Sequence, residues 1–266
     1  MEVGGYRIDP VIDGEGTMDP LSSFPDTTPQ QWEAHRAFRD ARGALPWALG
    51  GFLLRGHDRI ILVDLGYGPG VVGGIRTGRY LTSLAALGVE RAEVTDVLFT
   101  HLHIDHVGWA SVGGVAQFPN ATLWCSSADV EHFVTQRNDP PSYQRLDPCH
   151  DQLDTFDASP APAAVSLLAA PGHTPGSTIV VISGPGERAV LLGDVVHSPA
   201  QLLEPEWNTI WDVDPTLARR TRQRVVAELN GDASPAICAG HFPELRFGRL
   251  LVGEGRRYWS TDARAG

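Results

Sequence analysis

The feature that most constrains the fold is an arrangement that recurs four times: an apolar run typical of a buried strand, followed directly by a histidine or an aspartate. The runs and their following residues are 97–100 with His101, 166–172 with His173, 189–193 with Asp194, and 236–240 with His241. Glycine precedes the polar residue in the last three cases, which lets the backbone turn tightly at a strand end. If each run is a strand, these polar side chains meet at one edge of the sheets.

The first apolar run leads into a dense group of metal-binding residue types. His101, His103, Asp105 and His106 lie within a segment of six residues, directly after the strand predicted at 97–100. Short turns at a strand end can fold such side chains around one or two ions. For a lone histidine, a solvated loop would be the better interpretation, because motif matches carry a real false-positive risk. Packing alone gives no reason for four such residues together.

Seven side chains form the predicted ligand set: His101, His103, Asp105, His106, His173, Asp194 and His241. A tetrahedral catalytic zinc needs three protein ligands and a water, so seven donors suit two ions that share a bridging carboxylate. Nitrogen and oxygen donors without thiolate are compatible with Zn, Fe, Mn or Co. The alternative is a coincidental set of unrelated core and surface residues, which the repeated sequence context disfavours.

These motifs resemble the metallo-β-lactamase superfamily. The segments that carry the resemblance are His-x-His-x-Asp-His at 101–106, Pro-Gly-His-Thr-Pro-Gly-Ser at 171–177, Gly-Asp at 193–194 and Gly-His at 240–241. The resemblance implies one metal held by His101, His103 and His173, a second held by Asp105, His106 and His241, and Asp194 bridging them. It also implies a four-layer αββα sandwich of two mixed β-sheets, with helices outside and the metals at one edge.

Within that superfamily the sequence is most similar to the lactonase and esterase-like branch, which includes the N-acyl homoserine lactone lactonases and methyl parathion hydrolase. Residues 106–109 and 193–199 carry this similarity. The flavodiiron oxidoreductases have glutamate where this chain has His103, and class B β-lactamases lack a bridging carboxylate at the place of Asp194. In the lactonases, a tyrosine three residues after the bridging aspartate polarises the substrate carbonyl, and that position is His197 here.

The ligand set predicts hydrolysis. A water between two divalent cations has its pKa lowered toward about 7, and one cation can polarise a carbonyl or phosphoryl oxygen. We expect a dinuclear hydrolase, with two divalent ions (Zn²⁺ first), that cleaves an ester or lactone through a metal-bridging hydroxide. Asp105 and His197 are the predicted catalytic residues. A thioesterase or organophosphate hydrolase of the same fold is the alternative, and an iron-dependent oxidoreductase is a further one.

Two other polar residues admit two interpretations each. Asp64 ends an apolar run before a glycine-rich turn, and we predict that it orients a ligand histidine through a hydrogen bond. The alternative is a turn aspartate with local hydrogen bonds only. His197 either faces the substrate or a ligand, or it is an exposed loop residue. Four histidines without strand-end context are predicted not to be ligands: His35, His57, His132 and His150.

Composition argues against several function classes. The net charge is −11, and no basic cluster suits nucleic acid. The one basic run, 219–224, is predicted to be a solvated helix face. All 21 basic residues are arginine, which excludes Schiff-base lysine chemistry and the glutathione-holding lysines of glyoxalase-II-like enzymes. Three cysteines without close spacing argue against a disulfide framework. With no leader and no span of about 18 apolar residues, the expected location is the cytoplasm, without a membrane.

A coarse assignment of elements completes the prediction. We expect a single domain over 1–266, with an insertion at about 14–47 that forms a lid or a dimer contact. The predicted elements are a strand at 6–12, a short helix near 30–42, a hairpin of 49–54 and 60–63, helices at 80–87, 127–136 and 215–229, and a surface loop at 138–162.

Large apolar residues occur in the predicted insertion and in the segment after His197. They are Met18, Leu21, Phe24, Trp32, Phe38, Trp47, Leu202, Leu203, Trp207, Ile210 and Trp211. Such residues beside a metal edge suggest a hydrophobic pocket for a small-molecule substrate with an apolar part. Packing of the loops onto the body, or a homodimer contact, explains them equally well.

Overall fold

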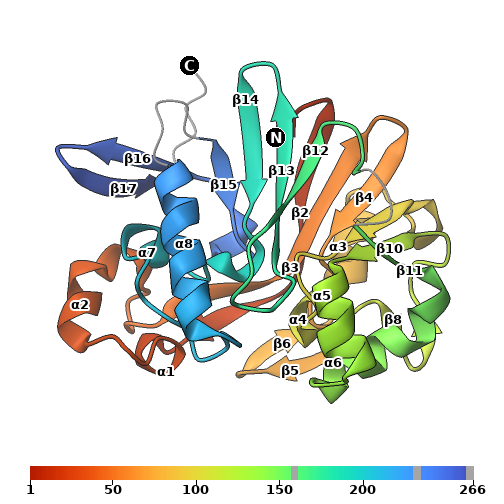
Figure 1. Ribbon diagram of the computed structural model, residues 1–266, viewed down its shortest axis with the longest axis horizontal. Coiled ribbons are helices and arrows are strands. Elements are labelled where there is room, and N and C mark those ends of the chain that lie inside the picture. The colour runs from red at the N-terminus through yellow and green to blue at the C-terminus, as the bar shows by residue number, and fades with distance from the viewer. Residues whose placement is uncertain (157–160, 230–234, 262–266) are drawn as a thin grey trace.

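Side chains along the central strands alternate between two apolar cores, and this alternation builds the layers of the molecule. Phe52, Leu54 and Ile61 belong to one core, whereas the interleaved Leu53 and Leu62 belong to the other. Because successive strand side chains point to opposite faces, the sheet that carries these residues is covered on both sides. The computed structural model describes residues 1–156, 161–229 and 235–261 (Figure 1).

The larger sheet is mixed and has seven strands in the order β1-β2-β3-β4-β7-β10-β11. These strands are β1 (Glu2–Val3), β2 (Tyr6–Met18), β3 (Leu45–Gly56), β4 (Arg59–Val63), β7 (Asp96–Leu98), β10 (Thr122–Cys125) and β11 (Leu153–Thr155). Pairing is antiparallel from β1 to β4 and parallel from β4 to β11. The predicted hairpin of β3 and β4 is confirmed, with β3 longer than expected.

The smaller sheet has four strands in the order β12-β13-β14-β15. They are β12 (Val165–Ala169), β13 (Thr178–Gly184), β14 (Glu187–Leu191) and β15 (Ala236–Cys238). Four consecutive residues of β13, Ile179 to Ile182, are buried, so both faces of this strand are covered. One apolar cluster joins residues of both sheets, so they pack face to face.

Helices cover the outer faces of the two sheets. Over the larger sheet lie α3 (Tyr80–Ala86), α4 (Ile104–Val107), α5 (Ser127–Asp129), the π-helical turn η3 (Val130–Thr135), α6 (Pro140–Leu146) and η4 (Asp147–Gln152). The smaller sheet is covered by α8 (Pro215–Leu229), which lies beside β14 and β15 (Figure 1). The predicted four-layer sandwich of two mixed sheets is confirmed.

Helix α8 follows the signals in its sequence. Pro215 stands at its first position, and Leu217 donates its backbone N–H to Asp214 Oδ1 over 2.9 Å. Its buried face repeats at helical spacing: Ala218, Thr221, Arg222, Val225, Val226 and Leu229. The prediction that the run 219–224 is solvated is wrong for two of its residues, because Thr221 is buried and Arg222 is completely buried.

The four predicted apolar runs form strands β7, β12, β14 and β15, and the predicted polar residues follow their carboxyl ends. β12, β14 and β15 run in the same direction, since β12 and β14 are both antiparallel to β13, and β14 is parallel to β15. Their carboxyl ends, and that of β7 in the other sheet, are followed by His173, Asp194, His241 and His101. The four strands are confirmed, and each ends two or three residues earlier than its apolar run.

Two boundary predictions are wrong. The first strand continues to Met18 because residues 14–18 pair with residues 45–49 of β3, so the insertion is narrower than 14–47 and spans residues 19–44. The single helix predicted near 30–42 is two short ones, α2 (Pro29–Ala34) and η1 (Arg36–Phe38), and a further short helix, α1 (Pro20–Ser23), precedes them. The predicted loop at 138–162 contains α6, η4 and β11, although its residues 157–160 lie outside the described part.

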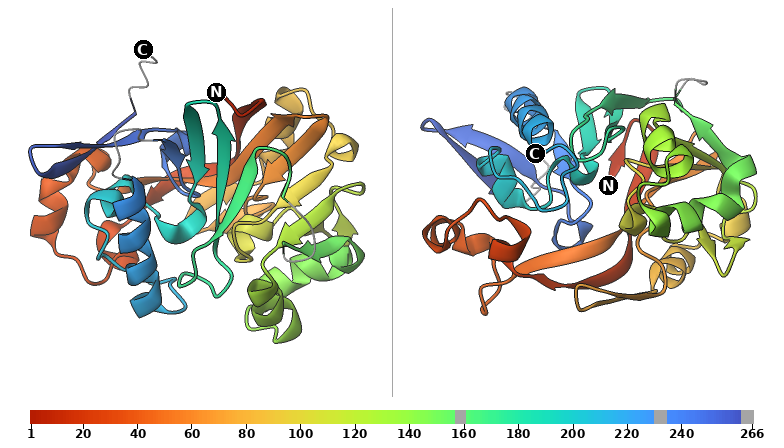
Figure 2. Two further views of the ribbon diagram at one scale, coloured as in Figure 1. Left: turned by 45° about the horizontal axis from the view of Figure 1, so that its top comes forward. Right: turned by 60° about the horizontal axis from the view of Figure 1, so that its bottom comes forward.

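The remaining elements are short hairpins and turns. β5 (Gly70–Val72) pairs with β6 (Ile75–Thr77), β8 (Ser111–Val112) with β9 (Val115–Ala116), and β16 (Arg249–Gly253) with β17 (Arg256–Ser260). Figure 2 shows β16 and β17 at the far side of the smaller sheet from β5 and β6. The short helical turns are η2 (Arg91–Glu93), η5 (Gly193–Val195), α7 (Pro199–Leu203) and η6 (Pro243–Leu245). In the described residues, no helix has the length and apolar character needed to cross a membrane.

Candidate metal centre

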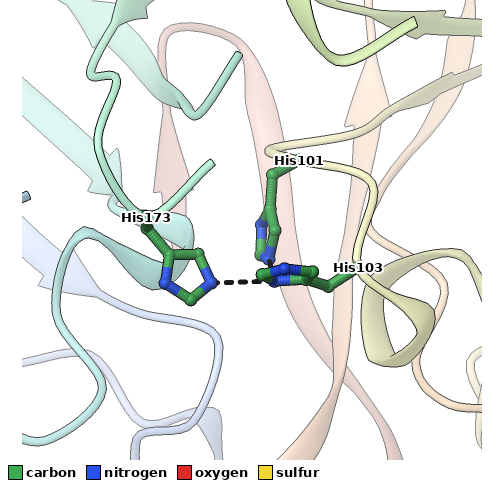
Figure 3. A group of neighbouring side chains, drawn as sticks. All are labelled: His101, His103 and His173. Carbon is green, nitrogen blue, oxygen red and sulfur yellow. Dashed lines mark hydrogen bonds between the residues drawn. The ribbon is translucent and has the colours of Figure 1, made fainter. Parts of the chain in front are cut away.

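Three histidines from two sheets point their ring nitrogens at one another (Figure 3). His101 Nε2 lies 3.1 Å from His103 Nδ1, which lies 2.9 Å from His173 Nε2. Ligand nitrogens at about 2.0–2.1 Å from one tetrahedral zinc are themselves about 3.3 Å apart. The spacing of these three nitrogens therefore fits a common cation.

A second group lies beside the first and contains Asp105, His106 and His241. His241 Nε2 is 3.5 Å from Asp105 Oδ2. The Asp194 carboxylate stands between the groups: its Oδ2 is 3.5 Å from His173 Nε2 and 3.0 Å from His241 Nε2, and its Oδ1 is 3.4 Å from His106 Nε2. All seven predicted ligand residues are thus brought together, and Asp194 has the central place expected of it.

Three of the histidines have Nδ1 held by a carboxylate or a backbone carbonyl, whereas His101 Nδ1 lies 3.2 Å from the Thr100 hydroxyl. His106 Nδ1 lies 2.8 Å from Asp64 Oδ2, and His173 Nδ1 lies 3.0 Å from Asp212 Oδ1. His241 Nδ1 lies 3.0 Å from the carbonyl oxygen of Ala48, which can only accept a hydrogen bond. In each case Nδ1 is the donor, so Nε2 is left with the lone pair that a metal requires.

His241 Nε2 and Asp194 Oδ2 lie 3.0 Å apart. With the proton of the ring on Nδ1, both atoms are acceptors, so a proton or a cation must lie between them. The same holds for His106 Nε2 and Asp194 Oδ1, both buried and without a hydrogen-bond partner among the described residues. Burial alone would lower the pKa of His106 and of His241, but Asp194 and the neighbouring carboxylates raise both. Protons held there occupy the positions that cations would take, and the donor set therefore fits two metal ions.

For His101, His103 and Asp194, in contrast, the pKa is lowered. Burial, together with neighbouring histidines, lowers the pKa of His101 well below its ordinary value and that of His103 to about 3. Burial would raise the pKa of Asp194, but His241, His106 and His197 lower it well below its usual range. Neutral imidazoles and an ionised carboxylate are the forms that bind divalent cations.

Asp64 lies beneath the histidines in a left-handed backbone conformation with φ of 60°. Its carboxylate accepts hydrogen bonds from the Thr100 backbone N–H over 2.8 Å and the Thr100 hydroxyl over 2.7 Å, in addition to His106 Nδ1. These partners are distant in sequence, so the alternative of purely local turn bonds is wrong. Aspartate tolerates this conformation better than most residues, and it is one that occurs at functional sites.

The predicted need for glycine at the strand ends is met at two positions. A Cβ atom at Gly240 would lie 2.6 Å from Asp194 Oδ1 and 2.9 Å from His106 Cε1. Gly193 has φ of 52°, and a Cβ there would lie 2.7 Å from the Thr100 Cβ. Any larger residue would push the donors apart.

His197 is buried, with 1% of its surface exposed, so the alternative of an exposed loop residue is wrong. Its ring stacks between those of Trp211 and His241, with both pairs of ring centroids 5.5 Å apart. Its Nε2 lies 3.2 Å from Asp194 Oδ2, and neither ring nitrogen has a hydrogen-bond partner among the described residues. Burial lowers the pKa of His197 to about 4, so the ring is neutral at neutral pH.

A cavity of about 240 Å³ opens directly onto these donors. Asp105, Asp194 and His241 lie in its lining together with His103 and His197. The rest of the wall is mainly apolar and comes from separate elements: Met18, Trp47, Leu49, Tyr67, Val72, Ile75 and Trp211. None of the described residues that line it is an arginine, and the chain has no lysine.

The apolar residues of the predicted insertion divide between two places. Phe24 and Trp32 pack against Trp207 in a separate buried cluster, which fastens the insertion to the body. Met18 and Trp47, at the ends of β2 and β3, line the cavity instead. Lining of a cavity therefore holds for Met18 and Trp47, and packing of the insertion onto the body holds for Phe24 and Trp32, while the homodimer contact stays a prediction.

Comparison with known families decides the family. The sequence profile described as "Metallo-beta-lactamase superfamily" matches residues 51–241, which is more than half of the chain and includes all seven donors. The chain belongs to the metallo-beta-lactamase superfamily. The resemblance in the motifs is thereby confirmed.

Two of the curated proteins that match this chain are named as lactonases. The protein named N-acyl homoserine lactonase AttM from Rhizobium radiobacter is 27% identical over 122 residues, which is 41% of this chain and 43% of that protein. AttM from Azorhizobium caulinodans is 26% identical over 183 residues, or 59% of this chain and 66% of that protein. The chain thus matches less than half the length of the first relative.

Solved superfamily structures cover nearly the whole chain. AidC, described as a dizinc quorum-quenching lactonase in complex with a product, has a TM-score of 0.84 and 23% identity, covering 98% of this chain and 95% of its own. The hydrolase AbOPH has a TM-score of 0.84 and 27% identity, covering 97% and 95%. These likenesses confirm the metallo-beta-lactamase fold of the chain.

Four buried charged residues around this superfamily site escaped the sequence analysis: Asp13, Asp129, Asp212 and Arg222. Asp129 accepts from the Leu102 and Gly176 backbone N–H groups and the Thr174 hydroxyl, so it joins the loops that carry His101 and His173. No local pattern marks these residues, since each contacts partners far away in the sequence.

Proposed function

We propose that this protein is a dinuclear metal-dependent hydrolase that cleaves a lactone or another carboxylic ester with an apolar acyl or aryl part. One observation carries the proposal: four of the seven clustered donors, His103, Asp105, Asp194 and His241, line an apolar cavity whose described lining contains no arginine or lysine. A neutral apolar group can enter such a cavity, whereas a carboxylate or phosphate on the part of the substrate that contacts the apolar walls would lose its hydration without a compensating positive charge from those walls. The named activity of the AttM relatives and of AidC agrees with this substrate class.

Two ions fit the proposal better than one. His101, His103 and His173 would hold the first, Asp105, His106 and His241 the second, and Asp194 would contact both. Zn²⁺ is the first choice because the donors are imidazole and carboxylate and because AidC is described as a dizinc enzyme. When bound, two such ions would lower the pKa of a water molecule and polarise the ester carbonyl.

Two residues of the chain have proposed roles in the reaction. Asp105 lines the cavity, and His106 and His241 lower its pKa although burial would raise it, so its carboxylate is ionised. It is positioned to accept a hydrogen bond from the attacking water and to orient it. Neutral His197 lines the same cavity and is the donor we propose for the negative charge that develops on the carbonyl oxygen, where the lactonases have tyrosine.

The substrate class is tested by measuring kcat/KM for acyl-homoserine lactones, aryl esters, thioesters and neutral organophosphate triesters. We expect turnover of lactones or carboxylic esters, and a loss of kcat/KM when a carboxylate is added to the same substrate. Turnover confined to charged or phosphorylated substrates would contradict the proposal. A preference for thioesters or for triesters would instead identify the protein as a thioesterase or an organophosphate hydrolase.

The metal assignment is tested by elemental analysis of protein purified without added metal. We expect two equivalents in the wild type, and about one equivalent with at least a hundredfold lower kcat in His106→Ala, because a ligand of the second ion is lost. His150→Ala, which removes an exposed histidine, is the matched control and should keep the metal content and the kcat of the wild type. Full metal content and full activity in His106→Ala would refute the ligand assignment, and a single iron would favour the oxidoreductase alternative.

A further inference from the structure

One completely buried guanidinium lies behind the site and contacts none of the seven donors. Arg222 projects from α8, and its side chain is 0% exposed. Its Nε donates to the Val195 carbonyl oxygen over 2.8 Å, its Nη1 donates to the carbonyl oxygens of Pro205 and Trp207, and its Nη2 donates to Asp212 Oδ2 over 3.2 Å. A buried arginine is costly unless its donors are satisfied, and here every nitrogen has an acceptor.

The first of these bonds fixes the turn that carries Asp194. Val195 follows Asp194 in η5, where Asp194 has a non-helical φ of −103° and ψ of 20°. Because no regular helix holds this turn, the bond from Arg222 to the Val195 carbonyl is one of its few anchors. The position of the central carboxylate thus depends on a residue of α8.

The second bond reaches His173 through one intermediate. Asp212 lies between Arg222 and His173, with Oδ2 toward the guanidinium and Oδ1 3.0 Å from His173 Nδ1. Burial would raise the pKa of Asp212, but the hydrogen bond from His173 and the charge of Arg222 lower it to about 2. The carboxylate is therefore ionised, and it holds the His173 ring with Nε2 toward His101 and His103.

The third set of bonds reaches His197. The Trp207 carbonyl oxygen accepts from Arg222 and also from Gln201 Nε2, over 2.9 Å for the latter. Gln201 Oε1 in turn accepts the backbone N–H of His197 over 2.7 Å. One side chain of α8 is therefore connected to three separate parts of the candidate metal centre, those that carry Asp194, His173 and His197.

We propose that Arg222 is a positioning residue that sets the relative placement of Asp194, His173 and His197, so that the affinity for metal depends on its planar, multiply bonded guanidinium. The inference rests on the proposed metal site and adds a residue that touches neither metal nor substrate. A lysine would keep the charge, but its single ammonium cannot reach Val195, Trp207 and Asp212 together.

The test measures the zinc affinity of metal-free Arg222→Lys by competition with a chromophoric chelator, together with the visible spectrum of the Co²⁺-loaded protein. We expect about a 10- to 100-fold loss of affinity, as for other residues that hold a ligand histidine from behind. We also expect a changed Co²⁺ spectrum, and a fall in kcat with little change in KM. Affinity and spectrum report on the site without any assumption about the substrate.

Two controls separate positioning from simple loss of stability. Arg220→Lys changes an exposed arginine on the same helix and should leave metal affinity unchanged. Val226→Ala removes buried apolar contacts of α8 and should lower Tm without weakening metal binding. Arg222→Lys must therefore lose more affinity than Val226→Ala at an equal loss of Tm.

Each outcome decides the question. Wild-type affinity and spectrum in Arg222→Lys overturn the inference and leave the proposed function standing, whereas a wild-type protein that binds no metal overturns both. Should Arg222→Lys fail to fold, Asp212→Asn provides the same test one bond closer to His173, because an amide cannot accept from both Arg222 and His173 through two carboxylate oxygens. Wild-type metal affinity in that variant would equally overturn the inference.

Discussion

Each of three ligand-type histidines has one nitrogen committed to the protein and one left for a cation, and the partner differs each time. His106 uses a carboxylate, His173 a carboxylate that is itself paired with arginine, and His241 a backbone carbonyl. A carboxylate raises the basicity of the imidazole more than a carbonyl does. The three histidines are therefore not equivalent, although the sequence presents all of them as histidines after an apolar run.

The cysteines provide a prediction at the same scale. All three are buried and free, which agrees with the absence of a disulfide framework, and burial raises the pKa of each thiol, that of Cys149 to about 11. An ordinary thiol in the unfolded chain ionises near pH 9. As the pH rises from 9 toward 11, the unfolded state loses this proton first, so the free energy of unfolding falls.

The measurement is urea unfolding at pH 8, 9 and 10 for the wild type and Cys149→Ala. We expect the wild type to lose more stability over this range than the variant, because only the wild type has that thiol to ionise. Equal pH dependence of the two proteins would show that Cys149 ionises alike in the folded and unfolded states.

At the scale of elements, Asp13 in β2 fixes the hairpin that forms one wall of the cavity. Its carboxylate accepts five N–H groups: those of the Tyr67, Gly68, Gly78 and Tyr80 backbone and the Trp109 indole, at 2.9–3.0 Å. These donors flank β5 and β6, whose Val72 and Ile75 line the cavity. One carboxylate thus shapes the wall that would contact the apolar part of a substrate.

Replacing this carboxylate tests that dependence. Asp13→Asn turns one acceptor oxygen into a donor facing other donors, so we expect a loss of about 2–3 kcal/mol in the free energy of unfolding. KM should rise for the proposed substrate while metal content stays at the wild-type value. Glu15→Gln, in the same strand, changes only an exposed ion pair and should be neutral. Unchanged stability and KM in Asp13→Asn would contradict this role.

Helices and strands can be predicted from the sequence where the local residue pattern and the tertiary contacts favour the same element. The four strands before the donors have apolar runs, and glycine marks the turns of three of them. Residues 14–18 of β2 do not read as a strand in the sequence, because only their pairing with β3 makes them one. The helix α6 begins at two prolines after Asp139, and prolines at this position are a helix start signal as well as a loop signal.

The same limit applies to the site. Asp64 and the seven donors follow apolar runs and could be found locally. Arg222 resembles the surface arginines beside it, because nothing in residues 219–224 shows that the fourth side chain of that run faces inward toward Asp212. The long-range contacts of buried charged residues cannot be predicted from a single sequence, because no local pattern marks them.

At the scale of the whole molecule, the donors divide between the two sheets. His101, His103, Asp105 and His106 follow β7 of the larger sheet, and His173, Asp194 and His241 follow strands of the smaller one. Two bound ions would therefore link the sheets at their common edge, in addition to the apolar core between them. Metal that binds only the folded chain stabilises it in proportion to the logarithm of its concentration over Kd.

Removing metal tests this link. Dialysis against a chelator should lower Tm, and readdition of Zn²⁺ should restore it, with a gain of about 2.7 kcal/mol once free zinc reaches a hundred times Kd. Differential scanning calorimetry gives the shift, and His106→Ala should show a smaller one. A Tm that does not change with chelator or zinc would mean that no metal connects the two sheets in the native protein.

The central position of Asp194 between donors from both sheets has a consequence for biogenesis. A newly made chain, or one whose halves have collapsed separately, presents only partial donor sets and would release any ion it captures. Stable metal binding would then require that the two halves have docked correctly. Cells starved of the ion would accumulate immature, inactive protein.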